Sequence, residues 1–106
     1  MDGYPVTPGH TLVIPRRHVA AYFDLSKQER RDADELLARI YRRLAQEDPA
    51  IRGYNIGLNC GAVAGQTIFH VHYHLIPRRK GDTDNPRGGV RGAIRGMRNY
   101  GPPDRP

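Results

Sequence analysis

The chain contains little that would place it in an oxidising compartment or in a membrane. Its 106 residues include one cysteine, Cys60, so no disulfide can form within the chain. No apolar run approaches membrane-spanning length, and the first residues lack the apolar core of a signal peptide. We therefore expect a cytoplasmic protein without membrane contact.

The net charge of +6 is concentrated near one end of the chain. Residues 1–77 hold nine basic and eight acidic side chains, whereas residues 78–106 hold eight and three. A basic segment attracts phosphate, nucleic acid or an acidic surface. Nucleic acid is not favoured, because no aromatic residues alternate with the basic ones to stack on bases. We divide the chain into one small domain, residues 1–80, and a basic tail rich in Gly, Pro and Arg, residues 81–106.

One strong helix signal lies between segments that read as strands. Ser26 and Glu29 form a capping-box pattern, and a 3.6-residue apolar period then predicts a helix over Lys27–Glu47, which Asp48-Pro49 ends. Such a helix is long enough to cover a small sheet. The predicted strands are His10–Pro15, Tyr54–Leu58 and a segment within Thr67–Pro77.

The third of these strands carries three histidines. His70, His72 and His74 alternate with Val71, Tyr73 and Leu75. Successive side chains of a strand point to opposite faces, so the three imidazoles share one face and the apolar face can pack under the helix. Three clustered imidazoles are unfavourable as core residues because each needs hydrogen-bond partners. The pattern therefore indicates a functional site.

A metal centre is one interpretation of this site, because three histidines can hold zinc with an open position. The sequence offers no carboxylate or second cysteine nearby, and Gly65–Thr67 forms a small polar loop suited to phosphate oxygens. A metal-dependent hydrolase thus remains an alternative, and a nucleotide site is favoured.

The segment His70–Ile76 resembles the histidine triad, in which three histidines alternate with apolar residues. Pro8–His18, Asn55–Asn59 and Ala64–Thr67 resemble the upstream strand and the phosphate- and ribose-contacting segments of the same family. The resemblance runs from Asp2 to about residue 79. It implies an α+β fold: a small, mostly antiparallel sheet with the long amphipathic helix packed on one face. It also implies a two-fold homodimer whose sheets join.

By this resemblance, the protein is an enzyme that cleaves at the α-phosphate of a nucleoside phosphoramidate or a (di)nucleoside polyphosphate. His72 is the nucleophile and forms a nucleotidyl-histidine that water or another acceptor resolves. In the family a backbone carbonyl holds the Nδ1–H of this histidine so that Nε2 faces phosphorus. No metal or other cofactor is required for the attack.

The remaining site residues are also assigned by the resemblance. His70 and His74 flank the nucleophile and bond phosphate oxygens, and His10 adds a donor for the developing oxyanions. His18 is expected to be a loop or surface residue. The nucleotide-binding residues would be Asp2 for the ribose hydroxyls, Asn59 for the phosphate or ribose, and Gln66 and Thr67 for the phosphates.

The sequence departs from the family at its start. Family members usually have a helix and one or two strands before the position of Asp2, and these wall the nucleobase pocket. Only Met1 precedes Asp2 in this sequence, so we expect either that its start is truncated or that another chain supplies this wall. The Cys-x-x-Cys with which some relatives bind zinc is not found either, so no structural zinc is expected. A catalytically weak nucleotide-binding module is therefore a second alternative.

Overall fold

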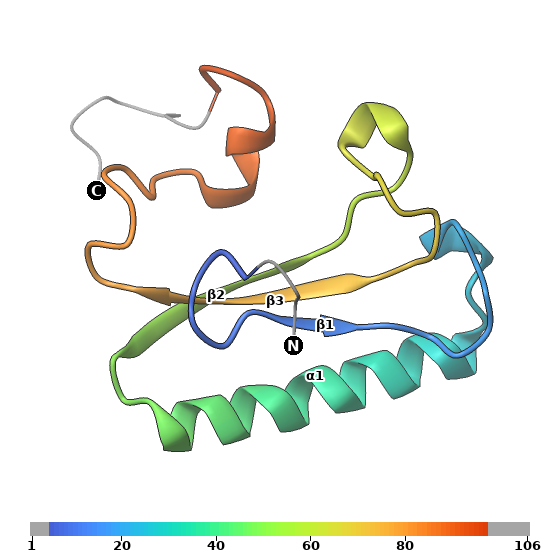
Figure 1. The fold of residues 1–106 in the computed structure, drawn as a ribbon, viewed down its shortest axis with the longest axis horizontal. Helices are drawn as coiled ribbons and strands as arrows, with labels where there is room; N and C mark the ends of the chain where they lie inside the picture. The colour runs from blue at the N-terminus through green and yellow to red at the C-terminus, as the bar shows by residue number, and fades with distance from the viewer. Residues whose placement is uncertain (1–4, 98–106) are drawn as a thin grey trace.

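A long helix packs on one face of a three-stranded antiparallel sheet in the computed structural model, which describes residues 5–97 (Figure 1). This arrangement confirms the predicted α+β architecture. Two short 3₁₀ helices lie in connections between these elements, and a third lies in the tail after the last strand. In chain order the elements are β1 (Thr11–Val13), η1 (Tyr22–Asp24), α1 (Lys27–Glu47), β2 (Ile51–Gly57), η2 (Ala62–Ala64), β3 (Tyr73–Arg79) and η3 (Gly89–Ala93).

The helix has the predicted bounds because its end signals are local. The Ser26 hydroxyl accepts a hydrogen bond from the Glu29 amide at 3.0 Å, and the Glu29 carboxylate accepts one from the Ser26 amide at 2.8 Å. Arg17 reaches the same carboxylate at 2.9 Å. The hydrogen bond from Arg17, together with those that join Glu29 to Ser26, lowers the pKa of Glu29 to about 2. The start of α1 is thereby tied to the segment that follows β1.

Strand β3 is the middle strand, with β1 and β2 on either side. It begins at Tyr73 and continues to Arg79, so it starts later than predicted and passes through Pro77. A proline is tolerated there because β1 pairs only with residues 73–75. The Pro77 carbonyl accepts a hydrogen bond from the Thr7 hydroxyl at 2.8 Å. Thr7 precedes β1, so the side of Pro77 that lacks an amide hydrogen faces residues before the start of β1 and no ladder hydrogen bond is lost.

The core lies between α1 and one face of the sheet. Along β3 and the residues before it, fully buried side chains alternate with partly buried ones, which places the histidines on the face away from α1. Leu75 has no exposed surface, and its burial contributes roughly 1.5–3 kcal/mol. The buried hydrophobic residues are Val13, Val19, Leu25, Ala33, Leu37, Val71, Tyr73 and Leu75.

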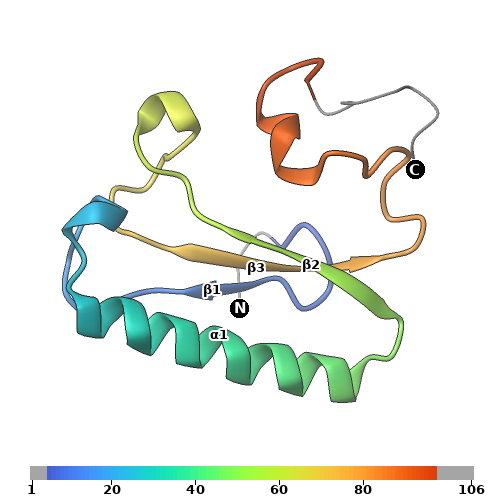
Figure 2. The same ribbon diagram turned by 180° about the vertical axis from the view of Figure 1, so that it is seen from behind.

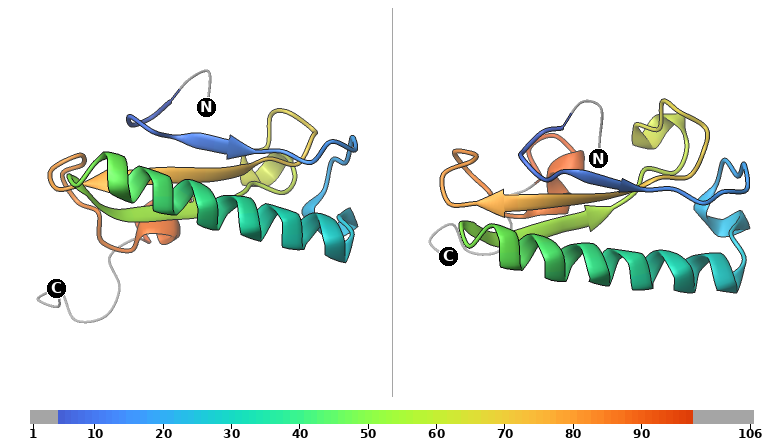
Figure 3. Two further views of the ribbon diagram at one scale, coloured as in Figure 1. Left: turned by 90° about the horizontal axis from the view of Figure 1, so that it is seen from below. Right: turned by 60° about the horizontal axis from the view of Figure 1, so that its bottom comes forward.

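The described part of the tail lies on the side of the sheet opposite α1, as do the connections around η2 (Figures 1 and 2). The left view of Figure 3 shows η3 nearer to β2 than to β1, and Gly89 of η3 lies against the Asn55 side chain of β2. Arg78 fixes the start of the tail, just after β3. Its guanidinium donates to the Asp82 carboxylate through two nitrogens, each at 2.8 Å, and to the Asn55 side-chain oxygen at 2.6 Å. The ion pair holds the pKa of Asp82 far below its ordinary value. None of the helices formed by residues 5–97 is long and apolar enough to cross a membrane.

Candidate functional site

The three histidines line one cavity on the sheet face that is turned away from α1. His70 and His72 lie just before β3, and His74 lies within it. The cavity has a volume of about 220 Å³. Aliphatic side chains form its remaining walls, and the described residues that line it are Leu12, Ile14, Ile68, His70, His72 and His74. The structure therefore brings the triad to one open, partly apolar hollow.

The tautomer of His72 is set by the main chain. Its Nδ1 lies 2.8 Å from the carbonyl oxygen of His70. A carbonyl oxygen can only accept a hydrogen bond, so Nδ1 carries the hydrogen. The neutral ring then has its lone pair on Nε2, the nitrogen that faces away from this bond. This is the arrangement that an imidazole nucleophile needs.

His74 and His10 are joined by a hydrogen bond between rings. His74 Nδ1 lies 2.8 Å from His10 Nε2, and the Val6 amide donates to His10 Nδ1 at 3.1 Å. His10 is 2% exposed, so it is a buried histidine with both ring nitrogens in hydrogen bonds. The His74 ring is also packed edge-on against the His72 ring, with centroids 5.1 Å apart.

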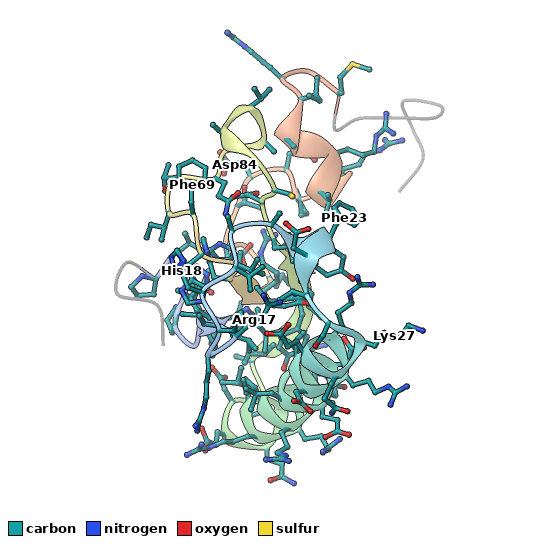
Figure 4. The ribbon with its side chains drawn as sticks, turned by 90° about the vertical axis from the view of Figure 1, so that its right-hand side faces the viewer. Arg17, His18, Phe23, Lys27, Phe69 and Asp84 are labelled. Atoms are coloured by element: carbon teal, nitrogen blue, oxygen red, sulfur yellow. The ribbon has the colours of Figure 1, made fainter. Side chains whose placement is uncertain are left out.

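The His70 ring lines the cavity and is also held by residues of the segment after β1. Its Nε2 donates to the Pro15 carbonyl at 3.0 Å, and its ring centroid lies 5.0 Å from that of His18. His18 is exposed, as expected of a loop residue, yet it packs against the first triad histidine. Figure 4 shows His18 and Phe69 on the same side of the molecule. The sequence indicates a loop or surface position for His18, with a zinc site shared with His10 and a triad histidine as an alternative, and the ring contact with His70 is seen only in the structure.

Backbone carbonyls of the segment after β1 hold the triad segment in place. The Val71 amide donates to the Val19 carbonyl at 2.7 Å, and the Gln66 side chain donates to the Ala20 carbonyl at 2.9 Å. The Pro15 carbonyl accepts from His70, as described above. Residues 15–20 therefore act as a brace whose hydrogen bonds to the triad segment are made by main-chain oxygens.

Gln66 is 5% exposed and its amide group is fully used by the protein. Its oxygen accepts from the Gly61 amide at 2.8 Å, and its nitrogen donates to the carbonyls of Ala20 and Ile68 at 2.9 and 3.1 Å. In this arrangement Gln66 closes the loop before the triad. The predicted contact with phosphate would require one of these donor bonds to be exchanged.

The other predicted nucleotide-binding residues are less constrained. Thr67 is exposed between Gln66 and the triad, and Asn59 is exposed two positions after β2 ends. The Asn59 side chain lies against Gly65, whose φ of +100° favours glycine. Asp2 lies outside the described residues.

A larger cavity lies elsewhere and carries no comparable chemistry. Its volume is about 390 Å³, and it runs between the end of β1 and the first half of α1. Its floor is made of core residues such as Val13, Leu25 and Tyr73, and no histidine lines it. Within residues 5–97, no group of three or more His, Cys, Asp and Glu side chains is placed to hold a metal ion.

Comparison with known proteins relates this site to one family. The HIT domain model matches residues 1–81. An asymmetrical bis(5'-nucleosyl)-tetraphosphatase of Schizosaccharomyces pombe is 40% identical over 78 residues, which are 74% of this chain and 42% of the relative. A bis(5'-adenosyl)-triphosphatase of Dictyostelium discoideum is 42% identical over 81 residues, 76% of this chain and 54% of the relative.

Solved structures agree with these matches. A HIT family protein from Bacillus anthracis is 39% identical with a TM-score of 0.68, over 73% of this chain and 54% of that one. A zinc-bound histidine triad family protein from Mycobacterium smegmatis is 38% identical with a TM-score of 0.71. The match covers 78% of this chain and 60% of that one. This chain thus spans about half the length of the proteins it matches.

Proposed function

The chain belongs to the HIT family, and on that premise we propose that it is a nucleotide hydrolase or nucleotidyl transferase. Its substrate would be a nucleoside phosphoramidate or a (di)nucleoside polyphosphate. Cleavage would occur at the α-phosphate through a covalent nucleotidyl-His72 intermediate. Some relatives are named as dinucleoside polyphosphate hydrolases, which supports the class of substrate.

The observation that carries this proposal is the bond between His72 Nδ1 and the His70 carbonyl. It leaves the lone pair of Nε2 available for attack. In the first step the Nε2–phosphorus bond forms and the bond from phosphorus to the leaving group breaks, with its electron pair going to the leaving atom. In the second step water attacks phosphorus, the Nε2–phosphorus bond breaks, and a nucleoside monophosphate is released with His72 restored.

The other residues would bind and position the nucleotide. His74 lines the cavity beside His72 and is suited to donate to a phosphate oxygen. His70 and Gln66 hold the triad segment through the chain's own carbonyls. Thr67, Asn59 and Asp2 keep the phosphate and ribose roles that the resemblance implies. The protein would act as a homodimer.

Intact mass spectrometry tests the intermediate. The protein is mixed with adenosine 5′-phosphoramidate or diadenosine triphosphate and quenched rapidly without acid, because a phosphorus–nitrogen bond is acid-labile. We expect an added adenylyl group on the wild type and none on His72→Ala. Cys60→Ser is the matched control, since Cys60 is an exposed nucleophile in the same half of the chain. The control should retain the adduct.

Three other results would contradict the proposal. AMP binding without an adduct or turnover would make the chain a nucleotide-binding module. Adduct formation that survives in His72→Ala but not in Cys60→Ser would move the nucleophile to Cys60. Turnover that is lost to a chelator and regained with zinc would favour a metal-dependent hydrolase.

A further inference from the structure

The hydrogen bond that sets the tautomer of His72 depends on the placement of a single peptide group. That group joins His70 to Val71, and its oxygen lies 2.8 Å from His72 Nδ1. Its N–H belongs to Val71 and donates to the Val19 carbonyl at 2.7 Å. A peptide group is planar, so its N–H and C=O point in opposite directions and move together. Fixing the amide hydrogen therefore fixes the direction of the oxygen that holds the nucleophile.

The residues on both sides of this peptide group are held as well. The His70 ring donates through Nε2 to the Pro15 carbonyl at 3.0 Å. The Val71 side chain is 2% exposed and lies in the same buried core cluster as Val19, which is 4% exposed. Pro15 and Val19 both belong to the brace, residues 15–20. One short segment therefore holds the peptide group from its amide side and from the ring that precedes it.

Arg17 joins the middle of the brace to the start of α1. Its guanidinium donates to both carboxylate oxygens of Glu29, at 2.9 and 3.3 Å, and to the Asp24 carbonyl at 2.9 Å. Glu29 is itself fixed by its capping bonds with Ser26, and its side chain is only 21% exposed. A two-pronged arginine–carboxylate pair is more directional than an ordinary exposed ion pair. Arg17 therefore limits how far the brace can shift along the triad segment.

We propose that the peptide group between His70 and Val71, held by the Val19 carbonyl, both directs and polarises the oxygen that binds His72 Nδ1. Arg17 is then a positioning residue that keeps Val19 in place. This inference rests on the proposed function, because it concerns the nucleophile of that reaction. Hydrogen bonds in a chain strengthen one another, since donation by the N–H leaves more negative charge on the oxygen of the same peptide group. A more negative oxygen favours the Nδ1–H tautomer and leaves Nε2 richer in electron density for attack on phosphorus.

Backbone esters test the Val19 carbonyl without altering a side chain. Lactic acid in place of Ala20 turns the Val19 carbonyl into an ester carbonyl, which is a weaker acceptor. Lactic acid in place of Ala21 is the matched control, because it weakens the Ala20 carbonyl, which accepts from Gln66 and not from Val71. Neither replaced amide donates a hydrogen bond within the described residues 5–97.

The rate of adduct formation at saturating adenosine 5′-phosphoramidate is the kinetic readout for the two esters. We expect the position-20 ester to lower this rate by about fivefold, which corresponds to a loss of about 1 kcal/mol from one hydrogen bond. The position-21 ester should stay within about twofold of the wild type, because the bond that it weakens does not involve the peptide group before Val71. Equal losses in the two esters would contradict the proposal.

The Nδ1–H signal of His72 gives a second readout that needs no turnover. Two-bond ¹H–¹⁵N correlation spectra of the substrate-free wild type should show the hydrogen of His72 on Nδ1. In the position-20 ester this proton should move to higher field, and part of the population should carry its hydrogen on Nε2 instead. The position-21 ester should match the wild type. An unchanged His72 signal in the position-20 ester would overturn the proposal.

Side-chain variants test Arg17, with Arg16→Gln as the matched control because Arg16 is exposed and has no ion pair within the part of the chain that the structure describes. We expect Arg17→Gln to lower the rate of adduct formation about threefold with little change in KM, the size of one well-formed surface ion pair. Arg17→Lys should retain more of the rate, and Arg16→Gln should match the wild type. Equal losses in Arg16→Gln and Arg17→Gln, or a rise in KM alone, would show an effect of charge on substrate binding and refute the positioning role. If the wild type forms no adduct, the proposed function fails, and the spectra of the esters alone decide whether this peptide group orients His72.

Discussion

The hydrogen bonds of Gln66 give a prediction about stability that separates a bracing side chain from a substrate ligand. Replacing Gln66 with Ala removes three bonds to the backbone at Gly61, Ala20 and Ile68, which measure 2.8–3.1 Å. Each such bond contributes roughly 1 kcal/mol net, so we expect a loss of about 3 kcal/mol in the free energy of unfolding. The free energy of unfolding of a small domain is about 5–15 kcal/mol in total, so the expected loss is a large fraction of it.

Urea unfolding followed by circular dichroism measures this loss. With a denaturant slope of roughly 1–3 kcal/mol per molar urea, the midpoint should fall by at least about 1 M. Thr67→Ala is the matched control, because it alters the adjacent exposed side chain, and it should stay within about 0.5 kcal/mol of wild type. If Gln66→Ala lost adduct formation while keeping the wild-type midpoint, the bracing role would be refuted and a direct role at the substrate supported.

Two further predictions concern the ends of loops and helices. Gly65 has a φ of +100°, which an alanine adopts only with strain, whereas the added methyl group would be in ordinary contact with Asn59. We therefore expect Gly65→Ala to lower the free energy of unfolding by about 1–3 kcal/mol through backbone strain alone, as measured by thermal unfolding. Glu29 has a folded-state pKa lowered from 4.5 to about 2, so its contribution to stability is present above pH 4.5 and is lost as the pH falls toward 2. As the pH is lowered from 4.5 to 2, the urea unfolding midpoint should fall more steeply for the wild type than for Glu29→Gln. The same pH dependence in both proteins would contradict a stabilising role for the Glu29 carboxylate.

Local signals in the sequence were sufficient for α1 and for the alternation of the triad. The start of α1 depends on Ser26 and Glu29, three positions apart, and its end on Asp48-Pro49. The two faces of the triad segment follow from residue-by-residue alternation, and the buried side chains of Val71 and Tyr73 confirm it. Such features need no knowledge of distant parts of the chain.

Contacts between distant residues could not be predicted in this way. The bonds from His10 to His74 and from Gln66 to Ala20 cross 64 and 46 positions, and they form only after the strands are paired. The sequence pattern predicts a strand that ends by Pro77, because the regular alternation stops there. The strand continues past it because β1 is short, which is a property of the sheet and not of the residues around Pro77.

The brace at residues 15–20 has a consequence for how this stretch can change over time. Its contacts to His70, Val71 and Gln66 are made by carbonyl oxygens, which every amino acid possesses. The acceptor atoms of these three hydrogen bonds do not depend on which side chains stand there, although Val19 is also a buried core residue, whereas an insertion or deletion would shift Val19 and Ala20 out of step with their donors. Among related genes, a gap in this stretch would mark loss of the chemistry more reliably than any substitution within it.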